Sequence, residues 1–180
     1  MQATPFNITA PALGMPGRSE PEVMGAVTWL WMHSPVHREL PLIALSQTLL
    51  APMKAQQYIL ASQADGEGGF RPVAYLAWAN LSAEAEARYV QGGASALLRD
   101  ADWTSGDRMW ITDWVTPFGH ANEFRHLVST LLAQSCFRAL YHRAGSGPQR
   151  VKAMRGANVS RAEADAWWSA RPLPAHASAI

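Results

Sequence analysis

A chain of 180 residues, of which 48% are hydrophobic and 16% are charged, is long enough to bury a core and too apolar to be disordered. The charged fraction lies below the globular average of about 25%. Together with eight tryptophans it predicts either apolar surface for a ligand or partner, or a tryptophan-rich core. A net charge of +1 argues against a nucleic-acid-binding protein, which normally has a strongly basic face.

The lone cysteine, Cys136, excludes an internal disulfide framework and fits a reducing compartment. Paired Cys/His motifs are absent from the sequence, so we expect no metal. Residues 1–17 lack the basic and apolar regions of a secretory signal, and nowhere do about 18 apolar residues follow one another. We therefore expect a soluble cytoplasmic protein with no segment inserted in a membrane.

Prolines and glycines among small residues predict a flexible N-terminal segment over residues 1–18. A first helix begins at Ser19, with Pro21 in its first turn and Glu22 placed to complete a capping box. The apolar residues of its predicted core face recur with helical spacing: Val23, Ala26, Val27, Leu30 and Trp31.

The remaining pattern alternates between helices and strands. Pro41 suits the first turn of a second helix, whose apolar side includes Leu42 and Ile43 and which ends before Pro52. The later elements are a β-hairpin of 58–61 and 70–78, a helix from Ser82 to about Gln91, a strand over 108–115, a helix capped by Asn122, strands over 137–141 and 150–154, and a helix from Ser160. This order predicts one α/β domain over 19–170, with helices flanking a mixed sheet, and a tail over 171–180.

The strand over 108–115 can be sorted by face, because side chains alternate along a strand. One face carries Trp110, Thr112 and Trp114, and the other carries Met109, Ile111, Asp113 and Val115. Asp113 thus interrupts an apolar row, where a carboxylate is costly unless it is paired or hydrogen-bonded.

The segment 29–38 holds the densest group of reactive side chains. Pro35 disfavours helix for Ser34, so the first helix should end near His33 and deliver Ser34 and His37 to a loop. A loop histidine can act as a general base near neutral pH, although His37 could also cap a helix. Ser34 could instead be a nucleophile activated by His37.

Three blocks of sequence stand out: Trp29-Leu-Trp-x-x-Ser-Pro-x-His-Arg38, Val73-Ala-Tyr-x-x-Trp-Ala-Asn-Leu-Ser82, and Asp102-Trp-Thr-Ser-Gly-Asp-Arg-x-Trp-Ile-x-Asp-Trp-x-x-Pro-Phe-Gly119. In content and order they resemble the toxin-activating lysine acyltransferases, bacterial cytoplasmic enzymes that fatty-acylate RTX protoxins. The resemblance is strongest to the members that activate an adenylate cyclase-haemolysin. The resemblance aligns His37 and Asp113 with the family's essential histidine and aspartate. It also implies that Tyr75 and Tyr89 match family tyrosines, which could donate a hydrogen bond to the leaving thiolate or the carbonyl.

The resemblance further implies an acyl-acyl carrier protein donor, an RTX protoxin acceptor, a homodimer, no permanent cofactor and a GNAT-like fold. The chain lacks a clear Arg/Gln-x-x-Gly-x-Gly/Ala loop for coenzyme A. Basic residues that could dock the acidic carrier are Arg38, Lys54, Arg71 and Arg108, and Asn80 could donate to an oxyanion. The alternatives are a non-catalytic chaperone that binds the protoxin and an N-acetyltransferase that uses acetyl coenzyme A.

Overall fold

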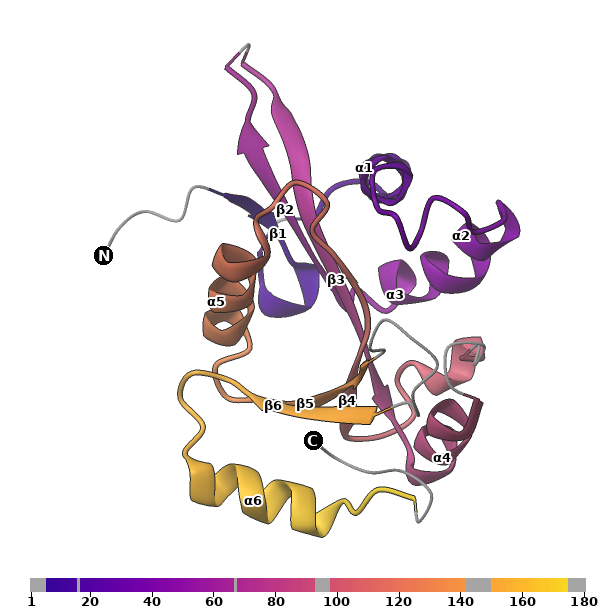
Figure 1. The fold of residues 1–180 in the computed structure, drawn as a ribbon, viewed down its shortest axis with the longest axis vertical. Helices are drawn as coiled ribbons and strands as arrows, with labels where there is room; N and C mark the ends of the chain where they lie inside the picture. The colour runs from indigo at the N-terminus through magenta and orange to yellow at the C-terminus, as the bar shows by residue number, and fades with distance from the viewer. Residues whose placement is uncertain (1–5, 16, 67, 93–97, 142–149, 175–180) are drawn as a thin grey trace. The chain divides into compact units, whose positions relative to one another are not determined.

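The computed structural model describes residues 6–15, 17–66, 68–92, 98–141 and 150–174 (Figure 1). These residues form an α/β fold around one mixed sheet with the strand order β1-β2-β3-β4-β5-β6. The strands are β1 (Asn7–Thr9), β2 (Tyr58–Ala64), β3 (Phe70–Leu81), β4 (Arg108–Val115), β5 (Cys136–Tyr141) and β6 (Arg150–Arg155). β4 and β5 run parallel, whereas β1 with β2, β2 with β3 and β5 with β6 are antiparallel.

The helices fall between these strands. They are the 3-10 helix η1 (Pro11–Leu13), α1 (Glu20–Met32), α2 (Ile43–Thr48), α3 (Leu50–Lys54), α4 (Ala83–Gly92), the 3-10 helix η3 (Asp100–Asp102), α5 (Ala121–Leu131) and α6 (Arg161–Ala170). None of the helices in the described ranges is long and apolar enough to cross a bilayer.

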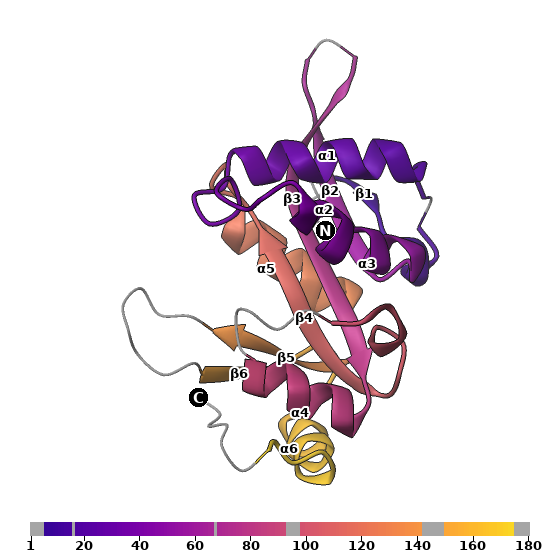
Figure 2. The same ribbon diagram turned by 90° about the vertical axis from the view of Figure 1, so that its right-hand side faces the viewer.

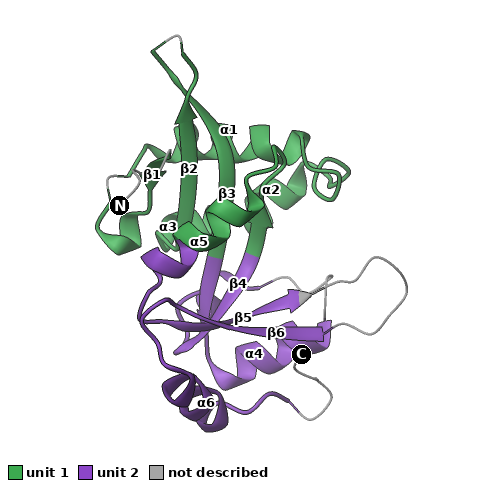
Figure 3. Ribbon diagram, turned by 60° about the vertical axis from the view of Figure 1, so that its left-hand side comes forward, with its two compact units in different colours: residues 1–77, 113–127 green, residues 78–112, 128–180 purple. Residues whose placement is uncertain are grey.

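The chain divides into two compact units, which Figure 3 distinguishes by colour. Unit 1 comprises residues 1–77 and 113–127, and unit 2 comprises residues 78–112 and 128–180. Both β3 and β4 contribute residues to each unit, so Asp113 belongs to unit 1 although the first half of its strand belongs to unit 2.

In unit 1, α1 lies across the strands beside α2 and α3 (Figure 2). Its predicted cap forms, because the backbone N–H and the hydroxyl of Ser19 both donate to the Glu22 carboxylate, at 2.9 and 2.5 Å. The buried face of α1 packs on the sheet in one core cluster: Val23, Val27, Leu30, Trp31, Ala44, Leu49, Met53, Tyr58, Leu60, Tyr75, Ala77 and Val115.

In unit 2, a buried carboxylate organises the packing of α4. Glu86 is 1% exposed and accepts hydrogen bonds from Arg108 Nε at 2.9 Å, Trp110 Nε1 at 2.8 Å and Arg138 Nη1 at 2.7 Å. The strand partners β4 and β5 supply the three donors that make its burial tolerable.

Several local predictions were wrong. Pro52 lies inside α3, where a proline is tolerated because the first turn has no helical acceptor for its N–H. Leu42 and Ile43 are 81% and 60% exposed instead of forming a buried side. α5 begins at Ala121, so Asn122 lies inside it. β5 begins at the buried Cys136, one residue before the predicted strand.

The N-terminal segment 1–18 contains β1 and η1, which the sequence did not predict. β1 pairs with β2 in the register Asn7 to Ser62 and Thr9 to Leu60, so its conformation comes from a partner distant in the chain. Residues 1–5 and 16 of this segment, and residues 175–180 of the predicted tail, lie outside the described ranges.

Candidate active site

The end of α1 fixes the position of the reactive loop. Ser34 N–H donates to Trp31 O at 3.0 Å as the helix closes. The chain then turns at Pro35, and His37 N–H donates back to Ser34 O at 3.1 Å. The structure thus places Ser34 and His37 in a loop directly after α1, where Pro35 predicted it.

Side-chain hydrogen bonds join this loop to β4. Ser34 Oγ lies 2.7 Å from His37 Nδ1, and His37 Nε2 lies 3.0 Å from Asp113 Oδ1. The second oxygen of Asp113 accepts from Trp31 Nε1 at 3.1 Å. The side chains of His37 and Asp113 are 14% and 13% exposed, so the group is largely shielded from water.

For an ionised Asp113 and a neutral imidazole, the contacts assign the proton positions, because a carboxylate can only accept hydrogen bonds. His37 Nε2 then carries the hydrogen and Nδ1 keeps a lone pair, to which the Ser34 hydroxyl donates. This is the arrangement of a base oriented by a carboxylate. It can remove a proton from a group that reaches Nδ1.

Tyr75 lies in the core of unit 1 near this group. Its side chain is fully buried, and its hydroxyl has no hydrogen-bond partner among the described residues. Burial raises the pKa of Tyr75 well above its ordinary value, and the charge of Asp113 and the neighbouring Tyr58 raise it further. The phenol therefore stays protonated, and its burial keeps it from solvent.

Comparison with known proteins decides the family. The HlyC model, described as the RTX toxin acyltransferase family, matches residues 18–155. The chain belongs to this family.

Three relatives within the family show how far the likeness extends. The RTX-I toxin-activating lysine-acyltransferase ApxIC of Actinobacillus pleuropneumoniae is 36% identical over 78% of this chain and 77% of its own length. The protein-lysine palmitoyltransferase CyaC of Bordetella bronchiseptica is 38% identical over 79% of this chain and 75% of its own. The protein-lysine myristoyltransferase HlyC of Escherichia coli is 39% identical over 66% of each chain.

In this acyltransferase, Tyr89 and Asn80 belong to unit 2, whereas the His37 group belongs to unit 1. Tyr89 is 8% exposed and meets the Trp110 ring edge to face at 5.5 Å between centroids. The backbone N–H of Asn80 donates a hydrogen bond to Trp103 O at 2.8 Å, within unit 2.

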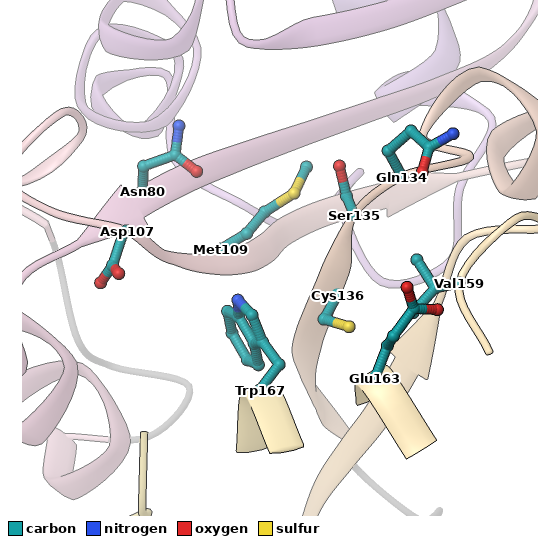
Figure 4. A pocket seen from close by; sticks show the side chains of 9 residues that line it. All are labelled: Asn80, Asp107, Met109, Gln134, Ser135, Cys136, Val159, Glu163 and Trp167. Atoms are coloured by element: carbon teal, nitrogen blue, oxygen red, sulfur yellow. The ribbon is translucent and has the colours of Figure 1, made fainter. Parts of the chain in front are cut away.

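Asn80 also lines a cavity of about 350 Å³ in unit 2 (Figure 4). The two carboxylates that line this cavity, those of Asp107 and Glu163, already have partners. Asp107 pairs with Arg171, whose hydrogen bond is the main reason why the pKa of Asp107 lies below its ordinary value. Glu163 accepts from Ser160 N–H at 2.8 Å. The other lining residues are Met109, Gln134, Ser135, Cys136, Val159 and Trp167.

The basic residues considered for carrier docking differ in their availability. Arg108 is bound to the buried Glu86, so it is not an exposed docking group. Arg38 pairs with Glu39 at 3.2 Å on the surface, and the Arg71 guanidinium lies 5.7 Å from the centroid of the Phe118 ring. Lys54 is exposed at the end of α3. No group of three or more His, Cys, Asp or Glu side chains in the described ranges could hold a metal ion.

Sequence reasoning missed Trp31 as part of the site. Its place on the core face of α1 was expected, but its indole N–H also binds Asp113. A signal was present, because a carboxylate in an apolar row needs donors and the indole of a buried tryptophan usually finds an acceptor.

Proposed function

We propose that this chain is a protein-lysine fatty acyltransferase, which moves an acyl chain from acyl carrier protein to internal lysine ε-amines of an RTX protoxin and so activates it. One observation carries the proposal: His37 is held between Ser34 Oγ and Asp113 in a member of an acyltransferase family.

His37 acts as the general base. A free lysine amine is scarce near neutral pH, since its unperturbed pKa is about 10.4. Once the lysine ammonium has released one proton to water, its nitrogen bonds to the thioester carbonyl carbon. A second N–H proton then passes to His37 Nδ1, and Asp113 stabilises the imidazolium through Nε2. The tetrahedral intermediate then expels the carrier thiolate, which takes up that proton. The products are the lysine amide and the carrier thiol.

Ser34 supports two routes. In direct transfer, its hydroxyl occupies Nδ1 until the lysine amine replaces it. In the alternative, Ser34 Oγ attacks the thioester while its proton passes to His37, the carrier leaves as its thiol, and the lysine amine then takes the acyl group from Ser34. The 2.7 Å contact suits both. We favour direct transfer because Ser34 is only 8% exposed, which hinders its attack on a bulky donor.

The tyrosines take lesser parts in the proposal. Tyr75 is fully buried, so we propose that it packs behind Asp113 and does not contact the leaving thiolate. A role for Tyr89 as a donor to the thiolate or the carbonyl rests on the family resemblance.

The wider proposal places an acyltransferase domain of GNAT-like architecture at residues 19–170, between the N-terminal segment 1–18 and a tail 171–180. The mixed sheet with helices packed on it supports that architecture. We further propose that the protein works in the cytoplasm as a homodimer, and that Arg38, Lys54 or Arg71 docks the acidic carrier protein.

The test is the mass of the client protoxin after incubation with acyl-acyl carrier protein and either wild type or His37→Ala. Wild type should add an acyl mass to lysine-containing peptides, and His37→Ala should lose at least about 10²-fold in rate, the usual contribution of a general base. His126→Ala is the matched control, since His126 is an exposed histidine of α5 in the same unit.

Other outcomes identify the rival functions. Acylation that persists in a folded His37→Ala protein contradicts the proposed base. A wild-type protein that binds the protoxin without adding mass is the chaperone. Acetylation with acetyl coenzyme A alone, without any use of the carrier thioester, indicates the acetyltransferase.

A further inference from the structure

Exposed apolar side chains gather in the segment that carries His37. Among the described residues, the exposed large hydrophobic side chains lie between residues 29 and 43, with Phe70 as the exception. Their exposed fractions run from 43% for Trp29 to 81% for Leu42. We call this set the 29–43 apolar surface: Trp29, Met32, Val36, Leu40, Leu42 and Ile43.

Folding of the chain does not account for this surface. α1 buries its other side through Val23, Val27 and Leu30, and α2 is anchored through Ala44. The residues of the 29–43 apolar surface stay in water, which is unfavourable for each of them. So many exposed large apolar side chains in one short segment favour a contact with another molecule, as exposed apolar patches on soluble proteins usually do.

The backbone places this surface beside the reactive histidine. Val36 lies inside the turn that His37 N–H closes on Ser34 O, and Leu40 N–H donates to His37 O at 2.9 Å. The two exposed side chains therefore bracket His37 along the chain. An apolar group joined to the atom that reacts at His37 would start next to this surface.

Charge narrows the choice of ligand. Arg38 and Glu39 are the segment's only arginine, lysine or acidic side chains, and they pair with each other. The charges of these two side chains therefore cancel within the segment, which leaves its apolar side chains as the main feature for a ligand to contact. A hydrocarbon chain needs no polar partner and gains free energy for each methylene that it buries.

We propose that the 29–43 apolar surface binds the hydrocarbon chain of the acyl donor. This inference rests on the proposed function. It adds the place where the hydrocarbon chain lies while the acyl carbonyl carbon reacts at His37. The surface then favours donors by the length of their chain.

A crosslinking experiment tests the location without requiring transfer. The probe is the acyl carrier protein thioester of a myristoyl chain that carries a diazirine near its methyl end. After photolysis, the labelled peptides should contain residues 29–43. Label that falls mainly elsewhere, for example around Cys136 in the unit 2 cavity, would overturn the inference. Label in 29–43 from a protein that transfers no acyl group would support the inference and contradict the proposed function.

A kinetic experiment uses chain length as its readout. The double variant Leu42→Ser, Ile43→Ser changes two exposed residues and should lower kcat/KM for a myristoyl donor by about tenfold, the scale on which apolar pockets discriminate. Its kcat/KM for a butyryl donor should change less than about twofold. Phe70→Ser, which removes an exposed apolar side chain outside the segment, should alter neither value.

Two results would overturn the inference. Equal losses of kcat/KM with both donors mean that the surface binds the carrier protein or the protoxin instead of the hydrocarbon chain. A dimeric wild type that becomes monomeric in the double variant, as measured by sedimentation, means that a second copy of the chain covers the surface.

Discussion

Asp113 can lie in an apolar row of β4 because donors meet both of its carboxylate oxygens. Trp31 Nε1 reaches one oxygen from α1, and His37 Nε2 reaches the other from the loop. A buried carboxylate without such donors would be strongly unfavourable. The same contacts orient the imidazole, so Asp113 serves both the packing of unit 1 and the proposed chemistry.

Asp113→Asn should therefore leave the protein folded and remove most of its activity. The amide can donate to His37 Nε2, which favours the tautomer with its hydrogen on Nδ1 and takes away the proposed base. We expect kcat/KM for acyl transfer to fall by about 10²- to 10⁴-fold. Asp107→Asn, which changes an exposed aspartate that binds Arg171, is the control and should keep its activity. Equal losses in the two variants would contradict a specific role for Asp113.

At the scale of the element, most of the fold could be predicted where the information was local. The Ser19 and Ser160 capping boxes, the hairpin of β2 and β3, and the bounds of β4 all follow from residues close in sequence. β1 could not be predicted, because three residues form a strand only through pairing with β2. At the site, Ser34 and His37 could be placed in a loop and Asp113 on its face, but their contact is a property of the folded chain.

The capping box of α6 should make stability depend on pH. Hydrogen bonds from the Ser160 side chain and backbone lower the pKa of Glu163 in the folded protein. A lowered carboxyl pKa stabilises the fold above the unfolded-state pKa, and this contribution is lost as pH falls through the folded-state value. Wild type should thus exceed Glu163→Gln in stability at about pH 7, and the difference should vanish by about pH 3. Urea unfolding at both pH values measures it, and an equal difference at both would contradict the prediction.

Two glycines should respond to alanine in opposite directions. Gly25 is exposed inside α1, and a Cβ there would meet nothing within 4 Å, so Gly25→Ala should stabilise the protein by about 0.5–1 kcal/mol. A Cβ on Gly156 would lie 2.0 Å from Leu132 O, close to the end of α5. Gly156→Ala should therefore destabilise by about 1–3 kcal/mol. Thermal unfolding of both variants tests the pair, and a stabilised Gly156→Ala would show that the close approach is wrong.

At the scale of the whole molecule, the two signs of charge nearly balance, and two arginines are bound inside the protein. The chain carries a net charge of +1, and its unit 2 arginines Arg108 and Arg138 are bound to the buried Glu86. The proposed acidic carrier must then be attracted by exposed basic groups such as Arg38, Lys54 and Arg71. Attraction of this kind acts mainly on the rate of association and is weakened by salt.

Raising the salt concentration should therefore increase KM for the acyl carrier protein donor and leave kcat nearly unchanged. Between about 0.05 and about 0.5 M salt, we expect the rise in KM to be several-fold. A neutral acyl-pantetheine thioester is the control donor, and its KM should not rise. Steady-state kinetics with both donors measure the effect. Parallel changes for the two donors would mean that salt acts on the enzyme rather than on docking.

The hydrogen bonds of His37 also affect hydrolysis of the donor thioester before a protoxin binds. Both ring nitrogens are engaged, one by Ser34 and the other by Asp113. A nearby water molecule therefore finds no free lone pair on the imidazole to accept its proton. Under the proposed mechanism, a loaded donor is protected from wasteful hydrolysis until an amine displaces the serine hydroxyl. The resting arrangement of the site would then conserve the activated acyl group for protein substrates.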